Sequence, residues 1–154
     1  MEEQMKAKWI WFDMDGTIAN LYGQKNWLED LIAEKVDPYL NAKPLYIIGD
    51  LLSAFWNLKL KGYNIGIISW CAKNGTAAYN EAVKQAKNQW LEETNLDILI
   101  DKVIITEYGK SKCESCKGFG EGILVDDEVQ NISTWTLGQT INAKDDIIAA
   151  LANL

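Results

Sequence analysis

The sequence predicts an α/β fold built on one parallel β-sheet that helices cover on both faces. Two observations predict it: strand-like segments alternate with helix-like segments, and the strand-like segments are continuous apolar runs. Continuous runs are typical of parallel strands, because both faces of such a strand are buried. A length of 154 residues is that of one ordinary domain, so we expect residues 1–154 to form a single domain.

In chain order, the first expected strand is Lys8–Phe12, a short apolar run that ends at an acidic turn containing glycine. Residues 24–35 carry apolar side chains at helical spacing with an acidic opposite side, and Asp37-Pro38 is expected to end this helix. Residues 48–60 repeat the helical pattern, and Gly62 supplies a stop signal for that second helix.

The second half of the chain begins with the expected strand Tyr63–Ile68, which has Ser69 at its end. A long helix is expected from about residue 75 to residue 93, and a closing helix over residues 147–151. The remaining strands are expected at residues 103–105, 123–125 and, more weakly, 140–141.

The charge and cysteine content restrict the partners and the compartment. Lys plus Arg number 15 against 22 Asp plus Glu, a net charge of −7, so the chain lacks the basic surface that long nucleic acids or anionic membranes require. No apolar run approaches the length of about 20 residues that spans a bilayer. Met1 to Lys6 lack the pattern of a secretory signal, and three cysteines are too few for a disulfide scaffold. These features predict a cytoplasmic protein, and they leave its oligomeric state open.

Histidine is absent from the sequence. Its absence excludes Ser-His-Asp and Cys-His catalysis as well as histidine-ligated zinc. An enzyme with this composition must transfer protons through carboxylates, lysine or a metal-bound water.

Polar side chains follow each of the four strongest expected strands: Asp13 and Asp15, then Ser69, then Lys110 and Lys112, then Asp126 and Asp127. Because the carboxyl ends of parallel strands meet at one edge of a sheet, we expect these side chains to converge. Clustered carboxylates raise one another's pKa values, and a hard cation bound by oxygen ligands, such as Mg²⁺, relieves that repulsion.

A metal, a lysine and a hydroxyl together form a cradle for a phosphoryl group. Asp13 is then free to present one oxygen to phosphorus as a nucleophile. Asp15, two residues further, is placed to protonate the leaving oxygen and later to activate water. Gly16 allows the sharp turn that brings both carboxylates to the same site.

The segment Phe12-Asp13-Met14-Asp15-Gly16-Thr17 resembles the first motif of the haloacid dehalogenase superfamily. Ile67–Ser69, a lysine before the last core strand and Leu124–Asp127 are similar to its second, third and fourth motifs, in that order. The resemblance implies a Rossmann-like, three-layer fold with a parallel sheet. It also implies a minimal helical cap insertion at approximately residues 20–45.

The resemblance also implies roles for the site residues. Asp13 would carry an aspartyl-phosphate intermediate, and Asp15 would act as general acid and base. Asp13, Asp126 and the backbone carbonyl of Asp15 would bind Mg²⁺. Asp127 would hold these ligands in position without contacting the metal. Ser69 would bind the phosphoryl oxygens by a hydrogen bond, and the lysine of the third motif would offset their charge.

Two lysines compete for that last role. Tyr108-Gly109-Lys110-Ser111-Lys112 resembles the Tyr-Gly-x-x-Lys form of small, phage-type members of the superfamily, and this alignment selects Lys112. Lys110 is the alternative, and in a third interpretation both are solvated loop charges.

An acid at Asp15 resembles the phosphatases and phosphomutases of the superfamily. Mutases generally carry a substantial cap, so the short insertion favours a Mg²⁺-dependent phosphomonoester hydrolase. The expected substrate is a small phosphorylated molecule such as a nucleoside monophosphate. This expectation draws on a resemblance to nucleotidase-like members and on Trp27 and Trp70, which would border the site and stack a base. In the alternative interpretation, both tryptophans only pack in the core or the cap.

Other functions stay open beside this one. A minimal cap also permits a phosphatase of a larger phosphorylated molecule, and a non-catalytic phosphate-binding module would keep the same fold. A signalling receiver domain is disfavoured because here the lysine precedes the second acidic pair. Cys113 and Cys116 fill only half of a zinc site, so we interpret them as ordinary thiols whose oxidation would disturb Lys112.

Overall fold

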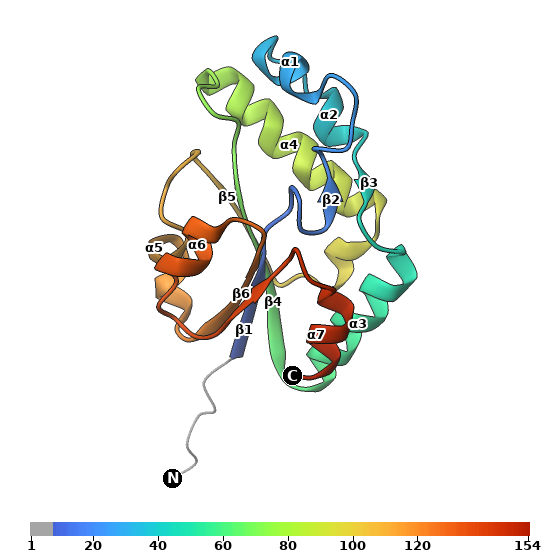
Figure 1. The fold of residues 1–154 in the computed structure, drawn as a ribbon, viewed down its shortest axis with the longest axis vertical. Helices are drawn as coiled ribbons and strands as arrows, with labels where there is room; N and C mark the ends of the chain where they lie inside the picture. The colour runs from blue at the N-terminus through green and yellow to red at the C-terminus, as the bar shows by residue number, and fades with distance from the viewer. Residues whose placement is uncertain (1–7) are drawn as a thin grey trace.

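A five-stranded parallel sheet in the order β5-β4-β1-β6-β7 forms the centre of the structure, a computed structural model that describes residues 8–154 (Figure 1). The strands are β1 (Lys8–Phe12), β4 (Tyr63–Trp70), β5 (Lys102–Thr106), β6 (Gly122–Asp126) and β7 (Thr140–Asn142). All five predicted strands are confirmed, although β4 continues through Ser69 to Trp70. The prediction on a secretory signal concerns Met1 to Lys6 and lies outside the described residues.

The main helices are α3 (Ile48–Leu60), α4 (Ala77–Glu93), α5 (Lys112–Cys116), α6 (Val129–Thr134) and α7 (Ile147–Ala152). Short 3₁₀ helices follow α4 at Leu96–Leu99 and α5 at Lys117–Phe119. The predicted helix over residues 48–60 is confirmed. The predicted helix over residues 75–93 starts two residues later, because the Thr76 hydroxyl caps it by accepting the N–H of Tyr79.

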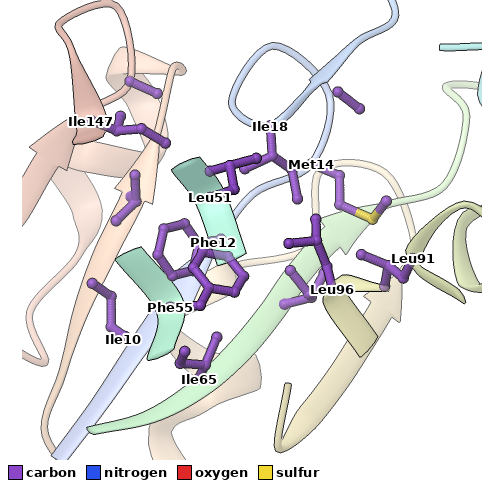
Figure 2. Packing of buried hydrophobic residues seen from close by; sticks show 14 of the residues in the cluster. Ile10, Phe12, Met14, Ile18, Leu51, Phe55, Ile65, Leu91, Leu96 and Ile147 are labelled. Carbon is purple, nitrogen blue, oxygen red and sulfur yellow. The ribbon is translucent and has the colours of Figure 1, made fainter. Parts of the chain in front are cut away.

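The two faces of the sheet carry different cores. Ile10 and Phe12 of β1 point to the face that α3 and α7 cover, where Phe12 packs on Phe55 with ring centroids 4.7 Å apart (Figure 2). Trp9 and Trp11 point to the opposite face, where they stack on each other with centroids 4.8 Å apart. This alternation along one strand shows a sheet that is buried on both sides, and the predicted three-layer α/β arrangement is confirmed.

The segment between β1 and α3 consists of β2 (Ala19–Asn20), α1 (Trp27–Ile32), α2 (Asp37–Leu40) and β3 (Lys43–Pro44), with β2 and β3 paired antiparallel. The prediction of one helix over residues 24–35 that ends at Asp37-Pro38 is wrong. The helix α1 ends earlier, at Ile32, and Glu34 has a left-handed φ of 56°. Asp37-Pro38 instead begins α2, because proline in the first helical turn lacks only an N–H that has no partner there.

The helices α1 and α2 lie beyond the carboxyl ends of the strands, beside α4 (Figure 1). The Tyr79 hydroxyl of α4 donates a hydrogen bond to the Lys35 carbonyl at 2.7 Å, and Tyr39 of α2 is buried with Tyr79 and Val83. The segment is therefore held against α4. Across residues 8–154, no helix combines the length and the apolar character that a membrane crossing needs.

Candidate active site

The predicted residues converge at the carboxyl edge of the sheet. Asp13 follows β1 directly, and its N–H donates to the Val125 carbonyl at 2.9 Å, so Asp13 is fixed beside the end of β6. Asp126 is the last residue of β6 and Ser69 the last but one of β4. All three are buried. They converge because β4 and β6 both pair with β1 in the parallel direction, which brings the carboxyl ends of the three strands to one edge of the sheet.

Three carboxylates form an acidic cluster at this edge. Asp13, Asp126 and Asp127 each offer an oxygen within 4.8 Å of the others. One Asp127 oxygen, Oδ1, is buried and has no hydrogen-bond partner in the part of the chain that the structure describes. A set of hard oxygen donors with one buried oxygen unsatisfied fits a divalent cation such as Mg²⁺.

Asp126 and Asp127 of the acidic cluster hold protons more tightly than isolated carboxylates do. Burial, reinforced by the negative charge of Asp13, raises the pKa of Asp127 to about 8. Burial and Asp13 also raise the pKa of Asp126, although Lys112 opposes them. A cation bound here would take the place of those protons.

Lys112 connects two of these carboxylates. Its buried ammonium donates to Asp13 Oδ1 at 2.9 Å and to Asp126 Oδ2 at 2.7 Å. Lys112 begins α5, whose N-terminus is capped by the Ser111 hydroxyl. Burial alone would lower the pKa of Lys112, but Asp13 and Asp126 outweigh it and raise that pKa. Lys110 is exposed, and its carbonyl accepts from the Trp70 indole N–H at 2.9 Å. The structure therefore brings Lys112, and not the Lys110 side chain, to the carboxylates.

Asp15 lies outside the acidic cluster and has a different partner. Its Oδ2 accepts a hydrogen bond from the Lys87 ammonium at 2.8 Å. Burial raises the pKa of Asp15, and the nearby Lys87 partly offsets that rise. The same ammonium donates to Ser69 Oγ at 2.7 Å, so Asp15 and Ser69 share one lysine.

Lys87 is the residue of this site that the sequence interpretation missed. It lies in α4, whose buried face is otherwise mostly apolar and includes Tyr79, Val83 and Trp90. A lysine at that helical spacing was the available signal, because a lysine among apolar positions needs a buried partner.

A pocket of about 360 Å³ opens over these residues. Asp13, Asp15, Ser69 and Lys112 line it on the side of the sheet. Its other walls are largely apolar and aromatic: Leu21, Tyr22, Trp27, Leu28, Leu31, Ile32, Tyr39, Trp70 and Tyr108 contribute to them. Trp27 packs edge-on against Tyr22 with centroids 4.9 Å apart, and Trp70 packs on Tyr108 at 5.0 Å. The pocket thus places Trp27 and Trp70 at the predicted site, and α1 forms one of its walls.

The cysteines are free thiols within residues 8–154. Cys116 is buried, and burial raises its pKa to about 12, so it stays protonated at neutral pH. The Cys113 sulfur lies 3.3 Å from the Thr136 hydroxyl. Both observations agree with the interpretation of ordinary thiols.

Gly16 has a positive φ of 81°, and a Cβ at this position would lie 2.3 Å from Asp127 Oδ2. We expect Gly16→Ala to cost about 1–2 kcal/mol of backbone strain and also to displace Asp127 and weaken metal binding. Gly62→Ala is the matched control, because Gly62 has a φ of 92° with nothing within 4 Å of the added carbon. Titration of Mg²⁺ by calorimetry should show weaker binding for Gly16→Ala alone. Equal affinity in both variants would contradict this account of Gly16.

The comparisons with known proteins bear on the fold. No family model matches the sequence, and no curated protein matches it. Among solved structures, the chain is similar to a D,D-heptose 1,7-bisphosphate phosphatase from Burkholderia thailandensis, with a TM-score of 0.58 and 12% sequence identity. The match covers 95% of this chain and 97% of that chain. It confirms the α/β fold that the resemblance to the haloacid dehalogenase superfamily implies.

Proposed function

We propose that this protein is a Mg²⁺-dependent phosphomonoester hydrolase of the haloacid dehalogenase type. The observation that carries the proposal is the buried Lys112 ammonium between Asp13 and Asp126, next to the unsatisfied oxygen of Asp127. A structural ion pair needs one carboxylate, whereas here the Lys112 ammonium contacts two, and Asp127 brings a third carboxylate within 4.8 Å of them. An excess of negative charge at the carboxyl edge of a parallel sheet attracts a cation, and that cation and Lys112 would together offset the charge of a transferring phosphoryl group.

In the proposed reaction, a carboxylate oxygen of Asp13 attacks phosphorus, and the bond from phosphorus to the leaving oxygen breaks. Asp15 gives its proton to that oxygen, which leaves an aspartyl-phosphate on Asp13. Asp15 then takes a proton from a water molecule as the water attacks phosphorus. This second step releases phosphate and restores both aspartates.

The other residues position the phosphoryl group and its charge. Ser69 Oγ would donate to a phosphoryl oxygen, and Lys112, which contacts Asp13, would offset the negative charge that Asp13 and the substrate bring together. Thr17 Oγ1 donates to Asp13 Oδ2 at 3.3 Å and helps fix the nucleophile.

Asp13, Asp126 and the carbonyl of Asp15 would hold Mg²⁺, with Asp127 supporting or joining them. The bound ion would supply further positive charge against the phosphoryl oxygens.

The pKa of about 8 for Asp127 makes the stability of the metal-free protein depend on pH. Because this carboxyl binds a proton more tightly in the folded than in the unfolded chain, its contribution to stability falls as pH rises from about 4 to about 8.

We therefore expect the metal-free protein to be more stable at pH 6 than at pH 8, and Mg²⁺ to raise the melting temperature more at pH 8. Thermal unfolding at both pH values, with Mg²⁺ and with chelator, measures this difference. Asp127→Asn removes the titrating group, so it should flatten the pH dependence of the metal-free protein between these values. A Mg²⁺ effect that is equal at both pH values in the wild type would contradict the prediction.

For the substrate, we propose a small cytoplasmic phosphomonoester, with nucleoside monophosphates as the leading class. The pocket volume of about 360 Å³ lies in the range of small-molecule sites, and its aromatic walls suit a planar base. The structural neighbour carries a sugar bisphosphate in its name. In this chain, the aromatic walls of the pocket favour a substrate that carries a planar base rather than one that carries a second phosphate.

Phosphate release from a panel of nucleotides, sugar phosphates and an aryl phosphate tests this function, with Mg²⁺ and with chelator. We expect Mg²⁺-dependent release and a preference for nucleoside monophosphates over ribose 5-phosphate. Trp27→Ala should reduce that preference, whereas Trp56→Ala, an exposed tryptophan of α3, should not. A preference for a phosphorylated polymer end would favour the alternative of a larger substrate. Phosphate-analogue binding without release from any substrate would favour a non-catalytic module.

A further inference from the structure

Lys87 is a buried cation in contact with two residues of the site, Asp15 and Ser69, and the mechanism above does not use it. Its side chain is 1% exposed. Its ammonium donates to Asp15 Oδ2 at 2.8 Å, to Ser69 Oγ at 2.7 Å and to the Trp70 carbonyl at 2.7 Å. An ammonium has three protons, so these contacts use its full donor capacity and aim it in one direction.

The contacts with Ser69 and the Trp70 carbonyl fix the Lys87 ammonium against the sheet, and the third contact orients the Asp15 carboxylate. Ser69 and Trp70 belong to β4, which lies between β5 and β1 in the sheet, and Lys87 itself lies in the middle of the long helix α4. Asp15, in contrast, lies in the turn after β1, and Lys87 is its side-chain partner among residues 8–154. The Asp15 side chain is 16% exposed and lines the pocket. Its direction is therefore set by a residue that the sheet and α4 hold still.

Burial makes the charge of Lys87 costly to the fold, so a role beyond packing is expected for it. A buried ammonium carries a desolvation cost that an apolar side chain of equal length would avoid. The Tyr39 ring of α2 lies 5.1 Å from the ammonium and adds a cation–π contact from the segment that covers the site. The three hydrogen-bond partners of Lys87 and the Tyr39 ring all belong to residues that line the pocket.

We propose that Lys87 is a positioning residue that holds the Asp15 carboxyl toward the leaving oxygen of the substrate. The inference rests on the proposed function, because Asp15 must be the acid that protonates that oxygen. In the first step the proton passes from Asp15 to the leaving oxygen, and in the second Asp15 regains a proton from water. Lys87 takes part in neither proton transfer and acts only through the orientation of Asp15.

The test separates orientation of an acid from general support of the fold. An alkyl phosphate needs a proton on its leaving oxygen, whereas 4-nitrophenyl phosphate releases a stable phenolate without one. Asp15→Asn should therefore lower kcat/KM about 100-fold for the alkyl phosphate and much less for the aryl phosphate. We expect Lys87→Met to show the same selectivity, with a loss of about 10-fold for the alkyl substrate. Lys84→Met, three residues earlier in α4, should change neither value.

Combining the variants adds a second readout. If Lys87 acts through Asp15, then adding Lys87→Met to Asp15→Asn should cause no further loss on the alkyl phosphate. Equal losses on both substrates in Lys87→Met, or a full additional loss in the double variant, would overturn the proposal. Lys87→Gln keeps a shorter donor and replaces Lys87→Met if the latter does not fold. Failure of both to fold would make Lys87 a structural residue.

Different results would refute the proposed function and the proposed role of Lys87. Wild-type protein that hydrolyses neither substrate, or an Asp15→Asn variant without selectivity between them, would refute the acid role of Asp15. A selective Asp15→Asn variant beside an unselective Lys87→Met variant would leave the function intact and remove only the role of Lys87.

Discussion

Asp13→Asn is expected to lower phosphate release by at least about 10⁴-fold, because an amide is a very poor nucleophile toward phosphorus. The substitution keeps the size of the side chain, and asparagine can still meet the Thr17 hydroxyl. It removes one negative charge from the acidic cluster, so the fold should survive. The measurement is kcat/KM at saturating Mg²⁺, with circular dichroism and thermal unfolding to verify the fold.

Asp50→Asn is the matched control for this substitution, since Asp50 is an exposed aspartate of α3 away from the pocket. It should retain wild-type activity. Rapid acid quench of the wild type during turnover should trap a phosphorylated, hydroxylamine-sensitive protein, and Asp13→Asn should give none. Near-native turnover in Asp13→Asn would refute the whole assignment, including every role that depends on an aspartyl-phosphate.

The predictable part of the site is the part that strand direction controls. Asp13 and Asp126 each stand at the end of an apolar run, and parallel pairing brings such ends to one edge regardless of the loops between them. Position relative to a strand was therefore enough to place them. The same reasoning placed Ser69, although β4 continues one residue beyond it.

Contacts that depend on the packing of distant segments are harder to predict from the sequence. Lys87 meets Asp15 across 72 residues of sequence, and only the position of α4 against the sheet creates that contact. The segment before α3 shows that helical spacing alone does not predict where a helix ends. Residues 24–35 keep helical spacing, yet Glu34 adopts a left-handed φ and the helix ends before it. Tertiary contacts to α4, such as Tyr79 to the Lys35 carbonyl, decide where this chain turns.

The choice between Lys110 and Lys112 shows the same limit at the scale of two residues. Both lie in one polar segment, and the sequence selects Lys112 only through its resemblance to the Tyr-Gly-x-x-Lys form. The structure does, because Ser111 caps α5 and so makes Lys112 its first residue, which turns the Lys112 side chain inward. Lys110 precedes the helix and is exposed.

Lys112→Met is therefore expected to lower kcat/KM by about 10³-fold, and Lys110→Met is expected to change it little. Without the ammonium, Asp13 and Asp126 face each other with no buried cation between them, and a phosphoryl group would bring further negative charge to the same place. The metal-free variant should also unfold at a lower temperature, and Mg²⁺ should recover more stability in it than in the wild type. The two lysines lie two residues apart and differ in burial, so the pair of variants isolates the buried charge. A large loss in Lys110→Met with little change in Lys112→Met would reverse the assignment, and equal small losses would mean that neither lysine compensates the phosphoryl charge.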